Sequence, residues 1–299
     1  GTITHADVLE AYGRHVAEFA RLQKPVHVAI DFANGMGIWE VKALKGVLTW
    51  DGLYEEPDGR FPNHEANPLH HATLAELQAK VRAGGYAFGV AYGDADRAGF
   101  VDERGEIIPM DLITALIAQD VLATRKGVIF YDLRSSWVVK ETIEAAGGTP
   151  MMSRVGHAFI KQQMREHDAL FAGELSGHYY FKDNFTAESS SLAILSLANI
   201  VSKSDCPLSA LIAPLRKYVA SGEINTQVTR DPKAILDELR AAYAEGRVFE
   251  LDGVSVEYAD WWFNVRCSNT EPLVRLNLEA RTAALMTAKR DEILAIIRK

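Results

Sequence analysis

The sequence predicts an α/β protein in which two mixed-sheet α/β domains are followed by a smaller α+β C-terminal domain. Three observations support this fold class. Short apolar runs at residues 26–31, 86–92 and 127–132 are typical of buried parallel strands. Helical patterns with apolar residues on one face alternate with these runs. After residue 215 the predicted strands and helices alternate differently, which indicates a separate last domain.

Composition excludes several classes of protein. The chain has 299 residues, enough for two or three domains, and a net charge of −8 that argues against a nucleic-acid partner. Its two cysteines, Cys206 and Cys267, lie far apart, which favours a reducing cytoplasm. No apolar run approaches the roughly 20 residues of a membrane span. We therefore expect a cytoplasmic protein without a membrane partner. The negative net charge does not exclude a phosphorylated substrate, because a local cluster of arginines can bind phosphate on an acidic protein.

The first domain is expected to cover residues 1–106. It begins with a helix over residues 4–22, which Thr4 could cap. Residues 51–70 are rich in Pro, Gly, Asp, Asn and His and are predicted to form an ordered loop. A hairpin over residues 100–108 closes the domain.

The second domain is expected to cover residues 107–215. A long apolar helix over residues 110–123 precedes the strand at 127–132. Two further helices are predicted over residues 189–202 and 207–218.

The last domain is expected to cover residues 216–299. Helices are predicted over residues 231–245 and 282–298, and Asp252-Gly253 is predicted to be a hairpin turn between apolar strands. A strand over residues 261–266 leads into a polar turn.

Polar and small or apolar residues alternate in the stretch Gly173-Glu-Leu-Ser-Gly-His178. Alternation places Glu174, Ser176 and His178 on one face of an extended or tightly looped segment. A carboxylate, a hydroxyl and an imidazole on one face could hydrogen-bond a ring of hydroxyls. An ordinary polar loop between two strands explains the same residues equally well.

Two acids at alternate positions end the strand at 86–92 and are followed by Arg97. Clustered carboxylates on a short loop supply the oxygen ligands that Mg²⁺ prefers, so Asp94 and Asp96 are candidate metal ligands. Arg97 could bind a phosphoryl oxygen while the metal holds another.

Two regions are candidates for binding phosphate. Arg134 follows the strand at 127–132, at the strand end where α/β proteins bind ligands, and a guanidinium there could clamp phosphate. The alternative is an ordinary surface arginine. In the last domain, hydroxyls, an amide and two guanidinium groups crowd one turn, which are the partners that a phosphate dianion needs. These residues are Arg266, Ser268, Asn269, Thr270 and Arg275.

Three of these stretches occur in the order found in the α-D-phosphohexomutases, and the chain resembles the phosphomannomutase/phosphoglucomutase branch of that family over essentially its whole length. Residues 173–178 are similar to the sugar-recognition loop, residues 93–97 to the metal loop and residues 266–275 to the phosphate-binding loop. The resemblance implies an isomerase of carbohydrate metabolism that interconverts hexose 1-phosphate and hexose 6-phosphate, with mannose or glucose as the sugar and Mg²⁺ as cofactor.

The resemblance also implies a role for each matching position. Arg97 and Arg134, the latter often Lys in the family, are expected to act in catalysis. Asp94 and Asp96 are expected to bind Mg²⁺. The expected substrate-binding residues are His157, which belongs to a Gly-His pair, and Glu174, Ser176, His178, Arg266, Ser268, Asn269, Thr270 and Arg275.

The metal loop departs from the family pattern Asp-Gly-Asp-x-Asp-Arg, because one of its three aspartates is missing. Either Tyr92 stands in its place, or Tyr92 matches the preceding residue and one residue is deleted; we favour the deletion. A neutral phenol is a weak ligand, so Mg²⁺ binding is expected to be weakened in both cases.

The family has four domains, and this chain resembles only the last three. In the family a serine of the first domain, in a Thr-Ala-Ser-His-Asn type of loop, carries the phosphoryl group, and no such loop is found here. We therefore expect the chain to be inactive alone and a missing N-terminal domain to be a partner. The alternative is a non-catalytic sugar-phosphate-binding module or an altered paralogue.

Overall fold

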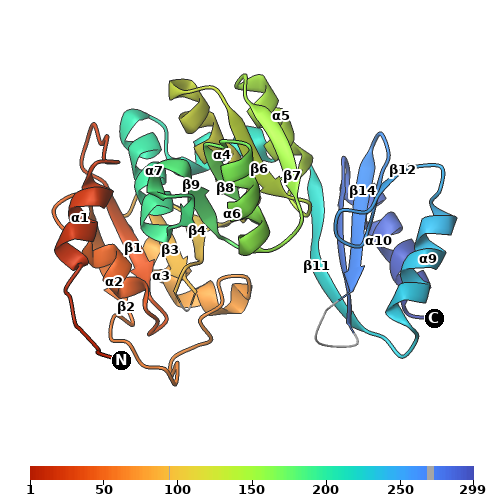
Figure 1. Ribbon diagram of the computed structural model, residues 1–299, viewed down its shortest axis with the longest axis horizontal. Helices are drawn as coiled ribbons and strands as arrows, with labels where there is room; N and C mark the ends of the chain where they lie inside the picture. The colour runs from red at the N-terminus through yellow and green to blue at the C-terminus, as the bar shows by residue number, and fades with distance from the viewer. Residues whose placement is uncertain (94, 268–272) are drawn as a thin grey trace.

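The computed structural model describes residues 1–93, 95–267 and 273–299. Three five-stranded sheets follow one another along the chain, each with its own helices (Figure 1). We call them the first unit (residues 9–108), the middle unit (residues 110–215) and the last unit (residues 219–297). Two sheets are mixed and the third is antiparallel, so the predicted fold class is confirmed.

The first unit has the strand order β2-β1-β3-β4-β5. β1 pairs in parallel with β2 and β3, whereas β4 is antiparallel to β3 and β5. The predicted hairpin over residues 100–108 is therefore confirmed as β4 and β5. The elements are α1 (Leu9–Ala17), β1 (His27–Asp31), α2 (Gly37–Lys42), β2 (Thr49–Leu53), η1 (His71–Leu74), α3 (Ala75–Arg82), β3 (Phe88–Tyr92), β4 (Ala98–Asp102) and β5 (Ile107–Ile108).

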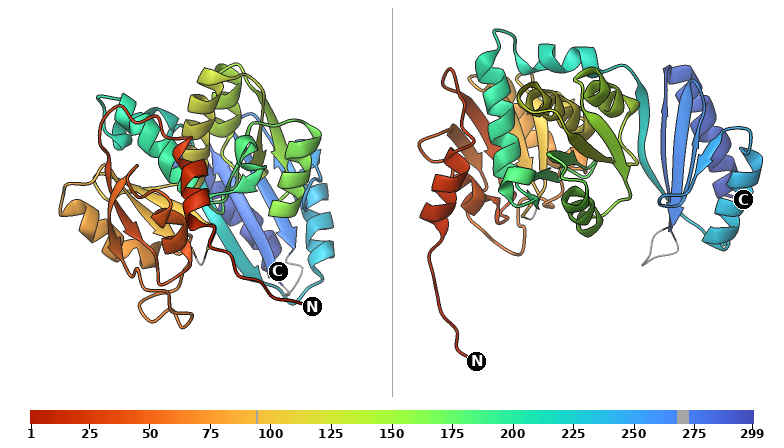
Figure 2. Two further views of the ribbon diagram at one scale, coloured as in Figure 1. Left: turned by 60° about the vertical axis from the view of Figure 1, so that its left-hand side comes forward. Right: turned by 45° about the horizontal axis from the view of Figure 1, so that its top comes forward.

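Two predictions for the first unit are wrong in part of their range. The first helix begins at Leu9, after Val8, and Thr4 does not cap it. Residues 1–8 are exposed and extend away from the body (Figure 2), so no packing stabilises a helix there. The loop predicted over residues 51–70 is confirmed from residue 54 onward, whereas residues 51–53 belong to β2, which forms because it pairs with the buried strand β1.

The middle unit has the strand order β10-β9-β8-β6-β7, with β6 parallel to β7 and β8 and the other pairs antiparallel. The Ser189 hydroxyl accepts a hydrogen bond from the Leu192 N–H and so caps α7. The helix predicted over residues 207–218 is shorter, because the chain turns into η3. The elements are α4 (Met110–Thr124), β6 (Val128–Asp132), α5 (Trp137–Ala145), β7 (Thr149–Ser153), α6 (His157–Glu166), β8 (Phe171–Gly173), β9 (Tyr179–Phe181), η2 (Lys182–Asn184), β10 (Ala187–Glu188), α7 (Ser190–Lys203), α8 (Leu208–Ile212) and η3 (Ala213–Leu215).

The last unit is an antiparallel sheet in the order β11-β15-β14-β13-β12, covered by α9 and α10 (Figure 1). The side chains of Asp231 and Thr282 cap these two helices. The predicted turn at Asp252-Gly253 joins β12 to β13 and is confirmed. The elements are β11 (Val219–Gln227), α9 (Pro232–Ala242), β12 (Arg247–Phe249), β13 (Val254–Glu257), β14 (Trp261–Cys267), β15 (Leu273–Ala280) and α10 (Ala283–Ile297).

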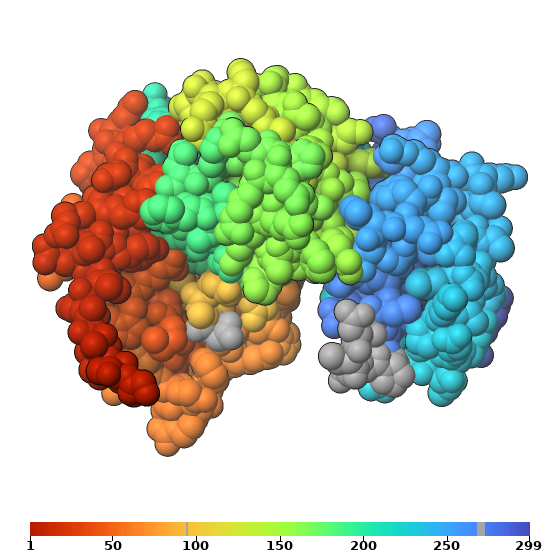
Figure 3. All heavy atoms as spheres, viewed as in Figure 1, coloured from red at the N-terminus to blue at the C-terminus, as the bar shows by residue number. Residues whose placement is uncertain are grey.

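The first and middle units share one hydrophobic core, whereas the last unit has a core of its own. Helix α7 joins the first two units, because it contacts both α2 and α4. The three units surround a hollow that opens between the first and the last unit (Figure 3). None of the helices in the described part of the chain is both long and apolar enough to cross a membrane.

Candidate functional site

The sugar-loop residues lie in a tight turn between β8 and β9. Glu174 N–H donates to the His178 carbonyl and Gly177 N–H donates to the Glu174 carbonyl, both at 3.0 Å. Gly177 has φ +89°, and a Cβ there would lie 2.9 Å from the Ala98 carbonyl oxygen. Only glycine fits both conditions without strain. The Ala98 N–H donates to the Gly177 carbonyl at 3.0 Å, so this turn is bonded directly to β4 in the first unit.

Glu174 is buried, with 2% of its surface exposed. Its Oε1 accepts from the Gly156 N–H at 3.1 Å and its Oε2 accepts from the Tyr180 hydroxyl at 2.6 Å. Burial raises the pKa of Glu174, but hydrogen bonds from His178 and Tyr180 outweigh it and leave the pKa below its usual value. The ionised carboxylate therefore holds the loop and the start of α6 together. Its predicted contact with sugar hydroxyls stays a prediction.

His178 links the predicted sugar loop to the predicted metal loop. Its Nδ1 lies 2.9 Å from Ser176 Oγ and 3.3 Å from Glu174 Oε2, and its Nε2 lies 3.4 Å from Asp96 Oδ1. Burial lowers the pKa of His178, yet the two carboxylates raise it to about 9. The imidazole is therefore positively charged at neutral pH and joins the first unit to the middle unit.

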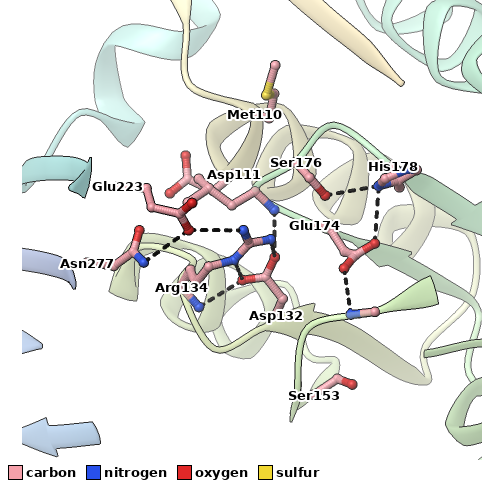
Figure 4. A network of polar contacts seen from close by, with 12 residues as sticks. Met110, Asp111, Asp132, Arg134, Ser153, Glu174, Ser176, His178, Glu223 and Asn277 are labelled. Carbon is pink, nitrogen blue, oxygen red and sulfur yellow. Dashed lines mark hydrogen bonds and ion pairs between the residues drawn. The ribbon is translucent and has the colours of Figure 1, made fainter. Parts of the chain in front are cut away.

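Arg134 lies at the carboxyl end of β6 and is almost fully buried. Its Nε and Nη2 donate to Asp132 at 3.1 and 2.7 Å, and the second oxygen of Asp132 also accepts from the Leu175 N–H at 2.8 Å. Burial lowers the pKa of Arg134, and the negative charges of Asp132 and Glu223 more than compensate. Arg134 is thus a fixed cation beside the sugar loop (Figure 4).

Arg266 and Arg275 face each other on the paired strands β14 and β15 of the last unit. Both contact the carboxylate of Glu223, at 2.6 Å for Arg266 and 3.3 Å for Arg275. The Nε of each is buried and has no hydrogen-bond partner among the described residues. The other predicted phosphate ligands, Ser268, Asn269 and Thr270, lie outside the described residues.

His157 begins α6 at the edge of this network. Its side chain is exposed and its Nδ1 lies 3.8 Å from Glu188 Oε1. The residue before it, Gly156, is the N-cap and donates its N–H to Glu174. The structure therefore connects His157 to the sugar loop through the backbone.

Three consecutive parts of the chain match models of one protein family. Residues 10–105 match "Phosphoglucomutase/phosphomannomutase, alpha/beta/alpha domain II", residues 109–218 match domain III and residues 223–296 match the C-terminal domain. The "Phosphomannomutase" of Escherichia coli is 36% identical, and the match covers 100% of this chain and 69% of that protein. The chain belongs to the phosphoglucomutase/phosphomannomutase family.

Other members of the family agree with this assignment. The "Phosphomannomutase" of Methanocaldococcus jannaschii is 41% identical over 91% of this chain. A crystal structure of a phosphoglucomutase/phosphomannomutase family protein from Burkholderia thailandensis superimposes with a TM-score of 0.90 at 31% identity, over 99% of this chain and 65% of that one. The chain spans 61% of the length of the M. jannaschii protein.

The predicted metal loop of this family member is described only in part. Asp94 lies outside the described residues, and Asp96 is paired with His178. Tyr92 is buried in the hydrophobic core and donates its hydroxyl to Glu40 at 3.3 Å. No group of three His, Cys, Asp or Glu side chains in the described part of the chain is placed to hold a metal. Mg²⁺ binding stays a prediction.

Arg97 is half-buried and folds over Gly93, since a Cβ at Gly93 would lie 3.3 Å from its Nε. The Gly93 N–H donates to the Arg97 carbonyl at 2.8 Å, which closes the turn between β3 and β4. The predicted catalytic role of Arg97 stays a prediction.

Two carboxylates of this phosphoglucomutase/phosphomannomutase family member were not predicted from the sequence. Asp132 ties Arg134 to the sugar loop, and Glu223 ties Arg134 to the last unit. An acid that ends a buried apolar strand is a signal that could have identified Asp132. No sequence pattern distinguishes Glu223, because its partners come from three other strands or loops.

Proposed function

We propose that this chain binds hexose phosphates and supplies the sugar- and phosphate-binding parts of a phosphohexomutase site of the phosphomannomutase/phosphoglucomutase type. The observation that supports this best is a network of polar contacts. Asp96 pairs with His178, and His178 contacts Glu174 beside Asp132 and Arg134 (Figure 4). The network joins the first and middle units through side chains that can bind hydroxyls and phosphate. Relatives named phosphomannomutase support the same reaction class.

The network places two fixed cations, His178 and Arg134, among the carboxylates of Asp96, Glu174 and Asp132. Because the pKa of His178 is raised to about 9, its imidazolium donates hydrogen bonds at neutral pH and does not act as a base. Arg134 keeps its charge at every accessible pH and orients a phosphate without exchanging protons. Ser176 lies on the same turn and is partly exposed, so its hydroxyl can contact a sugar hydroxyl, whereas the oxygens of Glu174 already accept from Gly156 and Tyr180.

The last unit supplies the second phosphate-binding region. Arg266 and Arg275 carry buried Nε–H groups that lack partners among the described residues, and a phosphate has the acceptor oxygens to satisfy them. In this proposal the phosphate binds these arginines while the sugar ring lies against the turn at residues 174–178. The chain then binds substrate but needs a phosphoserine from a family first domain to transfer the phosphoryl group.

A second candidate is a sugar-phosphate-binding module without catalysis. The observation that favours it is Tyr92, whose buried phenol donates to Glu40 and supplies no metal ligand. With one carboxylate fewer, the loop would hold Mg²⁺ too weakly to support phosphoryl transfer.

One experiment tests binding and another separates the two candidates. Ligand-observed NMR should show binding of mannose 1-phosphate or glucose 1-phosphate to the purified chain, and the absence of binding to either would overturn the proposal. The first domain of the E. coli relative is then added in trans with Mg²⁺ and glucose 1,6-bisphosphate. Turnover in the mixture supports the mutase site, whereas binding without turnover supports the module.

A further inference from the structure

Glu223 lies on β11, where the middle and last units meet, and three arginines surround its carboxylate. Oε2 lies 2.6 Å from Arg266 and 3.5 Å from Arg134, and Oε1 lies 3.3 Å from Arg275. Asn277 also donates to Oε2, at 3.4 Å. Because Arg134 belongs to the middle unit and the other three belong to the last unit, one carboxylate holds side chains from both units together.

The charge of this cluster suggests what can replace Glu223. The three arginines carry three positive charges, and Asp132 and Glu223 carry two negative charges, which leaves one positive charge. Without Glu223 two positive charges remain. A phosphate dianion, with a charge between about −1.5 and −2 at neutral pH, matches that number.

The hydrogen bonds of the cluster are also incomplete. A guanidinium has five N–H donors, and Glu223 contacts one terminal nitrogen of each arginine. The Nε atoms of Arg266 and Arg275 are buried without a partner among the described residues. Buried donors without partners are costly, and a phosphate offers more acceptor positions than one carboxylate. Exchange of Glu223 for phosphate would therefore satisfy donors that Glu223 leaves unused.

We propose that Glu223 is an internal substitute for phosphate, which holds Arg266 and Arg275 while the site is empty and releases them when a phosphate dianion binds. The proposal rests on the proposed function, because it takes these two arginines as phosphate ligands. Glu223 is then a positioning residue. Since Glu223 also holds Arg134, its release loosens the link between the middle and last units, and phosphate binding is coupled to movement at that junction.

Calorimetric titration with inorganic phosphate and with mannose 1-phosphate at low ionic strength tests the exchange. Glu223→Gln should bind both ligands at least about fivefold more tightly than the wild type, because the competing charge is gone. Glu238→Gln is the matched control, since it removes one carboxylate that pairs with Arg230 and Lys299 in the same unit and should leave affinity unchanged. Equal or weaker binding by Glu223→Gln would overturn the exchange.

Hydrogen–deuterium exchange without phosphate tests the link between the units. Residues 133–137 and 219–227 should exchange faster in Glu223→Gln than in the wild type or Glu238→Gln, and phosphate should produce the same change in the wild type. Glu223→Asp keeps the charge but shortens the side chain by one methylene, so its deuterium exchange should be intermediate between those of the wild type and Glu223→Gln. Glu223→Asp therefore provides the test if Glu223→Gln does not fold. Identical exchange in all variants would refute the link.

Arg266→Ala separates this inference from the proposed function. If Arg266→Ala binds phosphate as tightly as the wild type, the phosphate site is wrong and the exchange falls with it. If faster deuterium exchange in Glu223→Gln is still observed in that case, the link between the units stands without the phosphate site.

Discussion

Replacing Glu279 by Gln should remove a buried charge at the junction of the middle and last units without removing its hydrogen bonds. Glu279 is 2% exposed. Its Oε1 accepts from the Trp137 backbone N–H at 3.0 Å and from Trp262 Nε1 at 3.1 Å. The side-chain oxygen of Gln can accept the same two bonds. The difference between the two proteins is therefore the cost of burying the charge.

The magnitude of this cost follows from the pKa. Burial raises the pKa of Glu279 from 4.5 to about 6, against the hydrogen bonds from Ser136, Trp137 and Trp262 that lower it. Since one pKa unit corresponds to about 1.4 kcal/mol, the charged form costs about 2 kcal/mol. A carboxyl with a raised pKa contributes stability that is fully present below pH 4.5 and is lost as the pH rises through about 6.

Denaturant unfolding followed by tryptophan fluorescence, from about pH 4.5 to about pH 8, measures the effect. The wild type and Glu279→Gln should have similar stability at the lower pH, and Glu279→Gln should be more stable by about 2 kcal/mol at the higher pH. Glu279→Leu is the control that also removes the hydrogen bonds. It should be less stable than Glu279→Gln by about 1–3 kcal/mol for each buried donor left without a partner.

Two results would refute this reasoning. One is a difference between the wild type and Glu279→Gln that does not change with pH. The other is equal stability of Glu279→Gln and Glu279→Leu, which would show that the two tryptophan N–H groups do not depend on this side chain.

Four further predictions concern activity, metal, ligand and the sugar loop. The purified chain with glucose 1-phosphate, glucose 1,6-bisphosphate and Mg²⁺ should form no glucose 6-phosphate above background in a coupled dehydrogenase assay. Turnover by the wild-type chain that is lost when one of its own serines is mutated would contradict this prediction. Millimolar Mg²⁺ should hardly raise the melting temperature of the chain, and insertion of Asp after Tyr92 should strengthen Mg²⁺ binding. If Mg²⁺ raises the melting temperature by several degrees and Asp94→Asn removes this increase, the metal loop binds Mg²⁺ as it stands. Arg266→Ala should weaken sugar-phosphate binding by about tenfold or more, because a charge-assisted hydrogen bond contributes about 1.5–3 kcal/mol. Glu174→Ala should reduce the preference for mannose 1-phosphate over inorganic phosphate. An unchanged affinity of Arg266→Ala, or an unchanged preference of Glu174→Ala, in ligand-observed NMR would contradict the role of that residue. Gly177→Ala should destabilise the chain by about 1–3 kcal/mol because its φ is +89°; an unchanged urea midpoint would show that the turn adapts.

Local sequence determined most of the elements and the places of the three loops. Ser189, Asp231 and Thr282 each cap a helix that the apolar pattern also predicts, so two local signals agree at these positions. The turn at Asp252-Gly253 was predicted for the same reason. The cap predicted at Thr4 failed although an apolar pattern accompanied it, because a helix end needs packing that residues 1–8 do not have.

Tertiary structure alone decided which side chains meet. Asp96 and His178 form an ion pair because β4 bonds to the turn at Gly177, a contact between different units that no spacing in the sequence encodes. Glu223 meets the three arginines because the antiparallel sheet brings β11, β14 and β15 together beside the end of β6. Sequence determines residue types and local backbone preferences, whereas long-range pairing depends on the free energy of the whole fold, and that pairing sets the charges and pKa values of this site.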